Sequence, residues 1–294
     1  MSILQNKIDF SVLITVKNAN PNGDPLNGNR PRETYEGLGE ISDVCIKRKI
    51  RNRLQDMGEK IFVQSDDRCD DGFDNLRARA DGNEAIKAIS KGKNIDCDEY
   101  AKCDEYAKIA CAEWIDVRSF GQVFAFTGDK QPRSVRGPVS IQQAISVSPV
   151  DIVSMQITKS VNGSLSKKEG KAKDTMGTKH YVEFGLYIIN GSINCQLAEK
   201  TGFSNDDAEK IKHTLLTLFE NDVSSARPDG SMEVCRLYWW THNGKTPKYS
   251  SAKVHRQLEV KLKDGVERPL SFNDYNIRLN ELDGLVCEKY EDLI

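Results

Sequence analysis

Basic and amide side chains gather in two neighbouring segments near the start of this sequence. Residues 16–24 read Val-Lys-Asn-Ala-Asn-Pro-Asn-Gly-Asp, and residues 41–51 read Ile-Ser-Asp-Val-Cys-Ile-Lys-Arg-Lys-Ile-Arg. Asn, Pro and Gly form turns that leave backbone N–H groups free, and lysine and arginine neutralise phosphates. The two segments together predict a surface that holds a phosphate backbone. A solvated basic face without a ligand is the alternative.

A strand followed by a helix is predicted to position these groups. Apolar and polar residues alternate with a largely two-residue period over residues 9–17, which is typical of a strand. Apolar residues recur at intervals of three and four over residues 42–57, which predicts a helix with Ser42 as its N-cap. The basic residues of this helix fall on one arc beside the apolar stripe: Lys47, Arg48 and Arg51.

Charge is unevenly distributed along the 294 residues, whose formal net charge is −2. Residues 64–113 hold thirteen acidic and eight basic residues, whereas residues 159–179 hold six lysines and two acidic residues. A phosphate chain responds to local potential, so a basic groove is compatible with an acidic protein.

The remaining pattern predicts a mixed α+β fold. A second helix is expected to begin after Ser204 and to end near Asn221. Strands or extended segments are expected at four further places: residues 117–126, 135–158, 180–190 and 232–241. The resulting order β-α-β-β-α-β is that of ferredoxin-like and RRM-like folds, here interrupted by two insertions.

Four motifs, in this order along the chain, match those of a known family. The first two are Lys-Asn-Ala-Asn-Pro-Asn-Gly-Asp-Pro-Leu at residues 17–26 and the segment at residues 41–51. The other two are Asp-Val-Arg-Ser-Phe-Gly-Gln at residues 116–122 and Val-Arg-Gly-Pro-Val-Ser-Ile-Gln at residues 135–142. The sequence resembles the backbone subunit of the type I-C CRISPR Cascade complex, which belongs to the Cas-seven superfamily and binds guide RNA. The resemblance covers nearly the whole chain.

The resemblance implies an RRM-like palm, formed by residues 1–61 and 116–294, with a helical finger insertion at 62–115 and a β-hairpin thumb at 159–179. It implies that copies of the chain polymerise along a CRISPR RNA and present the guide for pairing with target DNA in antiviral defence. The expected partners are CRISPR RNA, target DNA through the guide, further copies of the chain, other Cascade subunits and a recruited helicase-nuclease.

The candidate RNA-binding residues lie in or near these motifs and carry cationic, amide or hydroxyl groups or free backbone N–H groups, which can bind phosphate and sugar. The predicted RNA-binding residues are Lys17, Asn18, Asn20, Arg30, Arg32, Ser42, Lys47, Arg48, Arg51, Ser119, Gly121, Gln122, Arg133 and Arg136. The thumb candidates, of which Leu165 and Met176 would wedge against an unstacked base, are Leu165, Lys167, Lys168 and Met176. A surface ion pair is the alternative for Arg133 and Arg136, and a disordered loop is the alternative for the thumb.

No catalytic residue, metal site or cofactor is predicted. The four histidines lack metal-ligand spacing, and the eight cysteines lack the close pairs of zinc ribbons, which favours reduced, packed thiols. The alternative function is a metal-dependent target-RNA endonuclease of type III-like character that uses Asp24, the acidic residue in the loop after the first strand. A carboxylate in an Asn-Pro-Gly turn is more often a turn former.

The sequence pattern also indicates the cellular compartment of the protein. No apolar run approaches the ~18–20 residues that a membrane span needs. The N-terminal residues lack the apolar region of a signal peptide. We therefore expect a cytoplasmic protein with no membrane partner.

An RRM-like RNA binder that acts alone is disfavoured, because the predicted strands lack an RNP-type aromatic pattern.

Overall fold

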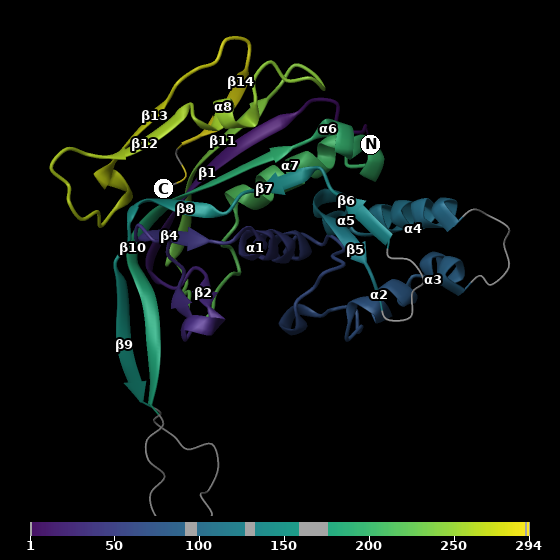
Figure 1. The fold of residues 1–294 in the computed structure, drawn as a ribbon, viewed down its shortest axis with the longest axis horizontal. Helices are drawn as coiled ribbons and strands as arrows, with labels where there is room; N and C mark the ends of the chain where they lie inside the picture. Colours follow the sequence, from purple (N-terminus) through teal and green to yellow (C-terminus); the bar gives the residue numbers. More distant parts are fainter. Residues whose placement is uncertain (1, 92–98, 127–132, 159–175, 292, 294) are drawn as a thin grey trace, which may run out of the picture.

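The computed structural model describes residues 2–91, 99–126, 133–158, 176–291 and 293, which form a mixed α+β structure built on a large antiparallel sheet (Figure 1). No helix among these residues is long and apolar enough to cross a membrane. The strands are β1 (Ile8–Ala19), β2 (Gly23–Asp24), β3 (Arg30–Pro31), β4 (Leu38–Ile41), β5 (Gly121–Phe124), β6 (Arg133–Arg136), β7 (Val139–Ile141), β8 (Ala144–Pro149), β9 (Ile152–Thr158), β10 (Met176–Ile193), β11 (Met232–Thr241), β12 (Leu258–Leu262), β13 (Tyr275–Leu279) and β14 (Val286–Tyr290). The helices are α1 (Asp43–Asp56), α2 (Leu76–Gly82), α3 (Glu84–Lys91), α4 (Glu99–Glu113), α5 (Ile115–Phe120), α6 (Cys195–Thr201), α7 (Asn205–Leu216) and α8 (Ser251–His255), with short 3-10 turns η1 (Pro25–Asn27), η2 (Asp66–Arg68) and η3 (Phe272–Asp274).

The main sheet has the strand order β14-β11-β1-β10-β8-β4, and β7 and β9 also pair with β10. The central strand β1 pairs antiparallel with both neighbours, so that Val12 lies opposite Ile189 on β10 and Leu237 on β11. These pairings confirm the strands predicted over residues 9–17, 180–190 and 232–241. The pairing of β1 with β10 and β11, which are distant in sequence, therefore fixes the strand ends from which the loops extend.

Alternate residues of β1 enter different cores because side chains of a strand point to opposite faces. Phe10, Val12 and Ile14 join the core formed with α1 and α7, where Ile50 and Leu215 are fully buried. This packing confirms the apolar stripe predicted for the helix at residues 42–57. The hydrophobic effect, at about 25 cal/mol per Å² of buried apolar surface, holds the helices to this face.

The opposite face of the sheet is covered by the C-terminal part of the chain. Leu13, Tyr238 and Trp240 pack there against Val254 of α8 and Tyr275 of β13. Trp240 is only 3% exposed, and Trp239 on the other face is 1% exposed. Neither ring is therefore free to stack on a base.

One predicted element is wrong in type. Residues 117–126 were expected to form a strand, but residues 115–120 form helix α5 and the strand β5 begins only at Gly121. A short apolar run does not distinguish the two structures by its periodicity. Gly121 ends the helix with φ 81°, and a Cβ added there would lie 2.3 Å from the carbonyl oxygen of Val135. The glycine therefore permits the close approach of β6 and the switch to strand.

Helices α2, α3 and α4 form a separate layer, drawn at the right in Figure 1. Its core combines Phe62, Tyr106, Trp114 and Phe124, all at most 5% exposed. The described residues between 62 and 113 thus include three helices that share an apolar interior of their own.

A two-stranded hairpin projects away from the sheet, as Figure 1 shows. Residues 152–158 of β9 pair with residues 176–182 of β10, from Val182↔Ile152 to Met176↔Thr158. The thumb was predicted over residues 159–179, of which only residues 176–179 are described, and these lie on β10. Leu165, Lys167 and Lys168 lie outside the described residues.

Candidate nucleic-acid interface

The C-terminal end of β1 presents two of the predicted RNA contacts to solvent. The side chains of Lys17 and Asn18 are exposed, and Asn18 has φ 53°, a left-handed conformation that asparagine tolerates. This end of the strand is held by the Lys17 N–H, which donates to the carbonyl of Ser231 at 2.8 Å. Asn20 differs from the prediction, because it is 4% exposed and its Nδ2 donates to the Asn29 carbonyl at 2.6 Å. Asn20 therefore shapes the loop from inside.

Ser42 is the N-cap of α1, as predicted. Its Oγ accepts from the N–H of Cys45 at 3.3 Å and donates to Oδ1 of Asn22 at 2.8 Å. The same Asn22 oxygen accepts from the Ser42 N–H at 2.9 Å. The hydroxyl proton is thus already used, so Ser42 serves to fix the loop onto the helix. Asn22 was missed as its partner, although it stands in the same turn-forming run.

The three basic residues of α1 have different surroundings. Lys47 remains partly exposed and pairs with Asp43 at 2.9 Å, and this bond holds the Asp43 pKa below its usual value. Arg48 instead donates to the carbonyl of Val63 at 2.6 Å. Burial lowers the Arg48 pKa, with a further contribution from Arg51. Arg48 is thus turned toward the chain that follows α1, although it stays partly exposed, and its contact with phosphate stays a prediction.

Arg51 is an internal structural residue. Its Nε donates to Oδ2 of Asp116 at 2.9 Å, and its guanidinium lies 5.0 Å from the centroid of the Phe120 ring. Asp116 is fully buried and also accepts from the N–H groups of Phe62 at 2.7 Å and Val63 at 3.1 Å. This bond ties α1 to α5 and to the start of the helical segment, and the contact of Arg51 with phosphate stays a prediction.

Arg30 and Arg32 lie on the short β2–β3 hairpin, beside the base of the β9–β10 hairpin. Arg30 Nη1 donates to Oγ of Ser154 at 3.2 Å, and Ser154 Oγ lies 2.8 Å from Nδ1 of His180. Arg32 Nη2 lies 3.5 Å from Oδ1 of Asp24. Both guanidinium groups remain partly exposed. Sequence reasoning missed Ser154 and His180, because 124 residues separate Arg30 from Ser154.

The two faces of the β9–β10 hairpin differ in character, because side chains alternate across a strand. One face carries Met155 and Ile157, which are 49% and 46% exposed. The other carries Ser154 and His180, and also Met176, whose sulfur accepts from Nε2 of Gln156 at 3.0 Å. Met176 was predicted as a wedge, but the two exposed apolar residues Met155 and Ile157 lie on the opposite face, which also carries Lys179. Their alternating positions are visible in the sequence and were overlooked.

Comparison of the sequence with models of known protein families identifies the family of this chain. The family model described as CRISPR-associated protein Cas7 matches residues 6–280. The chain belongs to the Cas7 family. The family predicted from the four motifs is thereby confirmed.

Two individual proteins illustrate the relationship. A curated relative, CRISPR-associated protein Cas7 of Haloferax volcanii (strain DS2), is 25% identical over 236 residues, which is 75% of this Cas7-family chain and 66% of the relative. A solved chain described as "CRISPR RNA-guided surveillance complex, pre-nicking" is 16% identical with a TM-score of 0.51, and covers 90% of this chain and 84% of that one. The second likeness concerns the fold alone.

Five further predicted contacts in this Cas7-family chain lie near α4 and α5, away from β2 and the β9–β10 hairpin (Figure 1). Ser119 is fully buried, so its hydroxyl is not at the surface to meet a phosphate. Gly121 is packed against β6, as described above. The side chain of Gln122 donates to the carbonyl of Val123 at 3.0 Å. The structure therefore separates this group from Lys17 and Arg30.

Arg133 and Arg136 both lie on β6, one residue at each end of the strand. The Arg133 guanidinium stacks over the Tyr106 ring, 4.6 Å from its centroid, and so belongs to the packing of the helical layer. Arg136 is exposed. Of these two, Arg136 has the exposure that a phosphate contact requires.

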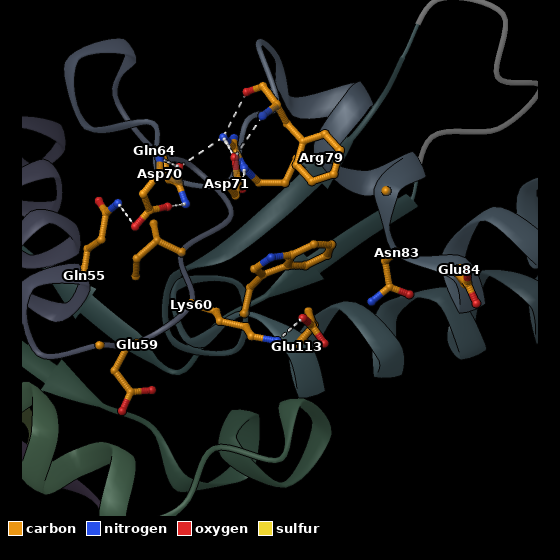
Figure 2. Close-up of a pocket in the computed structure, with 15 residues that line it drawn as sticks. Gln55, Glu59, Lys60, Gln64, Asp70, Asp71, Arg79, Asn83, Glu84 and Glu113 are labelled. Carbon is orange, nitrogen blue, oxygen red and sulfur yellow. Dashed lines mark hydrogen bonds and ion pairs between the residues drawn. The ribbon is translucent and has the colours of Figure 1, made fainter.

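A pocket of about 510 Å³ opens beside the end of α1, and Figure 2 shows its polar lining. Lys60 pairs with Glu113 at 2.7 Å, and Arg79 pairs with Asp71, so both cations are neutralised by carboxylates. Asp70 accepts from amide groups, Nε2 of Gln55 and Nε2 of Gln64. The remaining acidic residues that line the pocket are Glu59 and Glu84. Carboxylates outnumber cations in this lining, which disfavours an anionic ligand such as phosphate.

Asp24, the candidate metal ligand of the alternative function, acts as a cap. Its Oδ1 accepts from the N–H of Leu26 at 3.2 Å at the start of η1. Across the described ranges of the chain, no group of three or more His, Cys, Asp or Glu side chains is placed to hold a metal ion. The geometry of Asp24 is that of a turn former.

Proposed function

We propose that this chain is a guide-RNA-binding backbone subunit of a type I-C Cascade complex. The Cas7 family match over residues 6–280 carries the proposal. The solved chain of similar fold comes from a CRISPR RNA-guided surveillance complex, which supports it. Copies of the chain polymerise along a CRISPR RNA and present its bases for pairing with target DNA. Sequence recognition then belongs to base pairing, and the protein supplies charge and geometry.

The palm of this subunit has an RRM-like arrangement. The strand order β11-β1-β10-β8 with antiparallel pairing, α1 after β1 and α7 between β10 and β11 supports this topology. Because the C-terminal segment covers the sheet face, the RNA runs along the loops beside β1 and the β9–β10 hairpin. The partly or fully exposed side chains that line this path are Lys17, Asn18, Arg30, Arg32 and Lys47.

The β9–β10 hairpin acts as the thumb. Its exposed apolar face, with Met155 and Ile157, replaces base stacking where the guide strand is kinked and one base is turned out of pairing. The other Cascade subunits and a recruited helicase-nuclease complete the assembly and destroy the DNA. The chain itself performs no catalysis.

Purification of the chain from cells that carry a CRISPR array tests the function. We expect the protein to retain a small RNA of defined length and to assemble on it as a multimer, measured by RNA sequencing and by mass photometry. A monomer that retains no RNA, or a random collection of RNA fragments, would contradict the proposal.

Replacement of Asp24 separates the scaffold from a nuclease. Asp24→Asn keeps an oxygen that can accept from Leu26, so we expect guide binding to be unchanged within about two-fold, as for a neutral surface substitution. A metal site would lose its carboxylate ligand. The assembled complex is incubated with complementary labelled RNA and Mg²⁺ or Mn²⁺. Periodic cleavage by the wild type that Asp24→Asn abolishes would favour the nuclease instead.

A further inference from the structure

The pocket beside the end of α1 contains a hydrogen-bond donor that the protein itself does not use. Trp114, between α4 and α5, lines this cavity of about 510 Å³ and is 5% exposed. Among the described residues its indole N–H has no hydrogen-bond partner, and it is not one of the enclosed unpaired side-chain atoms. A tryptophan that is this deeply buried usually has a partner for its N–H. The free N–H therefore faces the pocket and can donate to a ligand.

The lining of the pocket carries an excess of negative charge, since its two cations pair with only two of its five carboxylates (Figure 2). Within the described ranges, Asp70 accepts hydrogen bonds only from neutral amides. Glu59 shares the ammonium group of Lys210 with Asp206, at 2.8 and 2.9 Å. Glu84 is exposed and has no partner in the part of the chain that the structure describes. These three carboxylates favour a cationic ligand.

An aromatic wall distinguishes between the possible cations. The half-buried ring of Phe73 lines the pocket next to Gly82, where a Cβ would lie only 2.2 Å from Cζ of the ring. The glycine therefore lets the ring reach this position. An arginine guanidinium is planar and weakly hydrated, so it can stack on an aromatic face while it binds carboxylates. A lysine ammonium group is a compact and strongly hydrated charge, which suits such a wall less well.

The free indole N–H sets a second requirement, because the ligand must also carry an acceptor. The ammonium groups of a protonated polyamine donate hydrogen bonds but accept none. A peptide segment has a carbonyl oxygen at every residue. An arginine within an extended peptide segment therefore offers both groups that the pocket needs.

We infer that this pocket binds an arginine side chain of an extended segment in a partner protein. The guanidinium pairs with the carboxylates that lack a cation, and a main-chain carbonyl of the same segment accepts from the Trp114 N–H. The cavity of about 510 Å³ lies within the range of about 300–1,000 Å³ that is usual for ligand pockets. The inference goes beyond RNA binding, since it assigns a protein-docking site to the helical layer and involves none of the residues proposed to line the RNA path.

The test follows the indole N–H resonances of the full chain, labelled with ¹⁵N-tryptophan, by NMR. The chain has three tryptophans, and the Trp114→Phe variant identifies the signal of Trp114. The probe is the capped peptide acetyl-Gly-Arg-Gly-amide. We expect a saturable shift of the Trp114 resonance, while the signals of the buried Trp239 and Trp240 stay unchanged. Replacing Arg with Gln in the peptide should weaken binding about 10-fold, through the loss of bonds between charged groups.

Variants of the lining test the role of charge. Glu84→Gln should weaken binding of the arginine peptide about 3-fold, as expected for one exposed ion pair. Glu59→Gln combined with Glu84→Gln should weaken it about 10-fold. Unchanged signals of Trp239 and Trp240 show that each variant is folded. Asp264→Asn, which removes an exposed carboxylate from the turn after β12, is the matched control and should leave the affinity unchanged.

Spermidine separates an arginine site from a general cation site, because it supplies positive charge without an acceptor. We expect it to leave the Trp114 resonance unshifted. A spermidine shift equal to that of the arginine peptide would refute the inference, and so would equal affinities for the arginine and glutamine peptides. An unchanged affinity in the variant that lacks both Glu59 and Glu84 would also refute it. RNA retention enters none of these measurements, so the proposed function stands or fails separately.

Discussion

Replacement of Asp116 with alanine is expected to lower the free energy of unfolding by about 3 to 5 kcal/mol. The Asp116 carboxylate is fully buried and satisfies the Arg51 guanidinium and the N–H groups of Phe62 and Val63. The variant leaves Arg51, whose side chain is 12% exposed, without its ion-pair partner, and it leaves two backbone donors unpaired. Urea denaturation measures the change.

Asp43→Ala is the matched control for this prediction. Asp43 also pairs with a basic residue of α1, Lys47, but its side chain is 41% exposed. An exposed pair of this kind is worth about 0–1 kcal/mol, so the loss of stability should be about 1 kcal/mol at most. Equal losses in the two variants would contradict the structural role that we assign to the Asp116 and Arg51 pair.

Deletion of the thumb is expected to abolish RNA-dependent assembly while the protomer stays folded. Residues 153–181 are replaced with Asn-Gly, a two-residue turn that can join the paired residues Ile152 and Val182. The base of the hairpin remains tied, because Arg268 bonds to both Asp151 and Glu183. RNA affinity should fall by about 100-fold or more, since base contacts and a phosphate contact are lost together. Circular dichroism and mass photometry measure folding and assembly.

A milder variant tests the apolar face without removing the hairpin. Met155→Gln combined with Ile157→Gln should weaken assembly. Leu270→Gln combined with Val286→Gln, which changes two residues of 54% and 63% exposure elsewhere, should not. A thumb-deleted protein that still forms regular assemblies on RNA would show that the hairpin is dispensable.

The basic residues of α1 differ in their surroundings, and this difference decides which of them can be used to test phosphate binding. Arg48 and Arg51 share a helix with Lys47, yet they bond to Val63, before the helical layer, and to Asp116, which follows it. A change of RNA affinity in an Arg51 variant must therefore be compared with the stability of that variant. Lys47 is the residue of this arc whose replacement tests phosphate contact, because its partner Asp43 is exposed.

Local sequence was sufficient for the main elements. The alternation over residues 9–17 and the helical spacing over residues 42–57 predicted β1 and α1, and Ser42 is the N-cap that was expected. These patterns are local because a strand or helix buries one face of its own residues. The strand predicted over residues 117–126 was wrong for residues 117–120, which are helical, and right for residues 121–124, which form β5. A few apolar residues fit either a buried helix or a buried strand, and packing against β6 decided between them.

The sequence by itself determined the family, the principal strands and helices, and a concentration of basic and amide residues after β1. The tertiary structure decided which of those residues remain available. It paired Arg51 with Asp116 across 65 residues and Arg30 with Ser154 across 124, and it covered Tyr238 and Trp240 with the C-terminal segment. These outcomes depend on distant elements that meet only when the sheet is assembled, since ion pairs and burial are set by distance in space rather than by order along the chain.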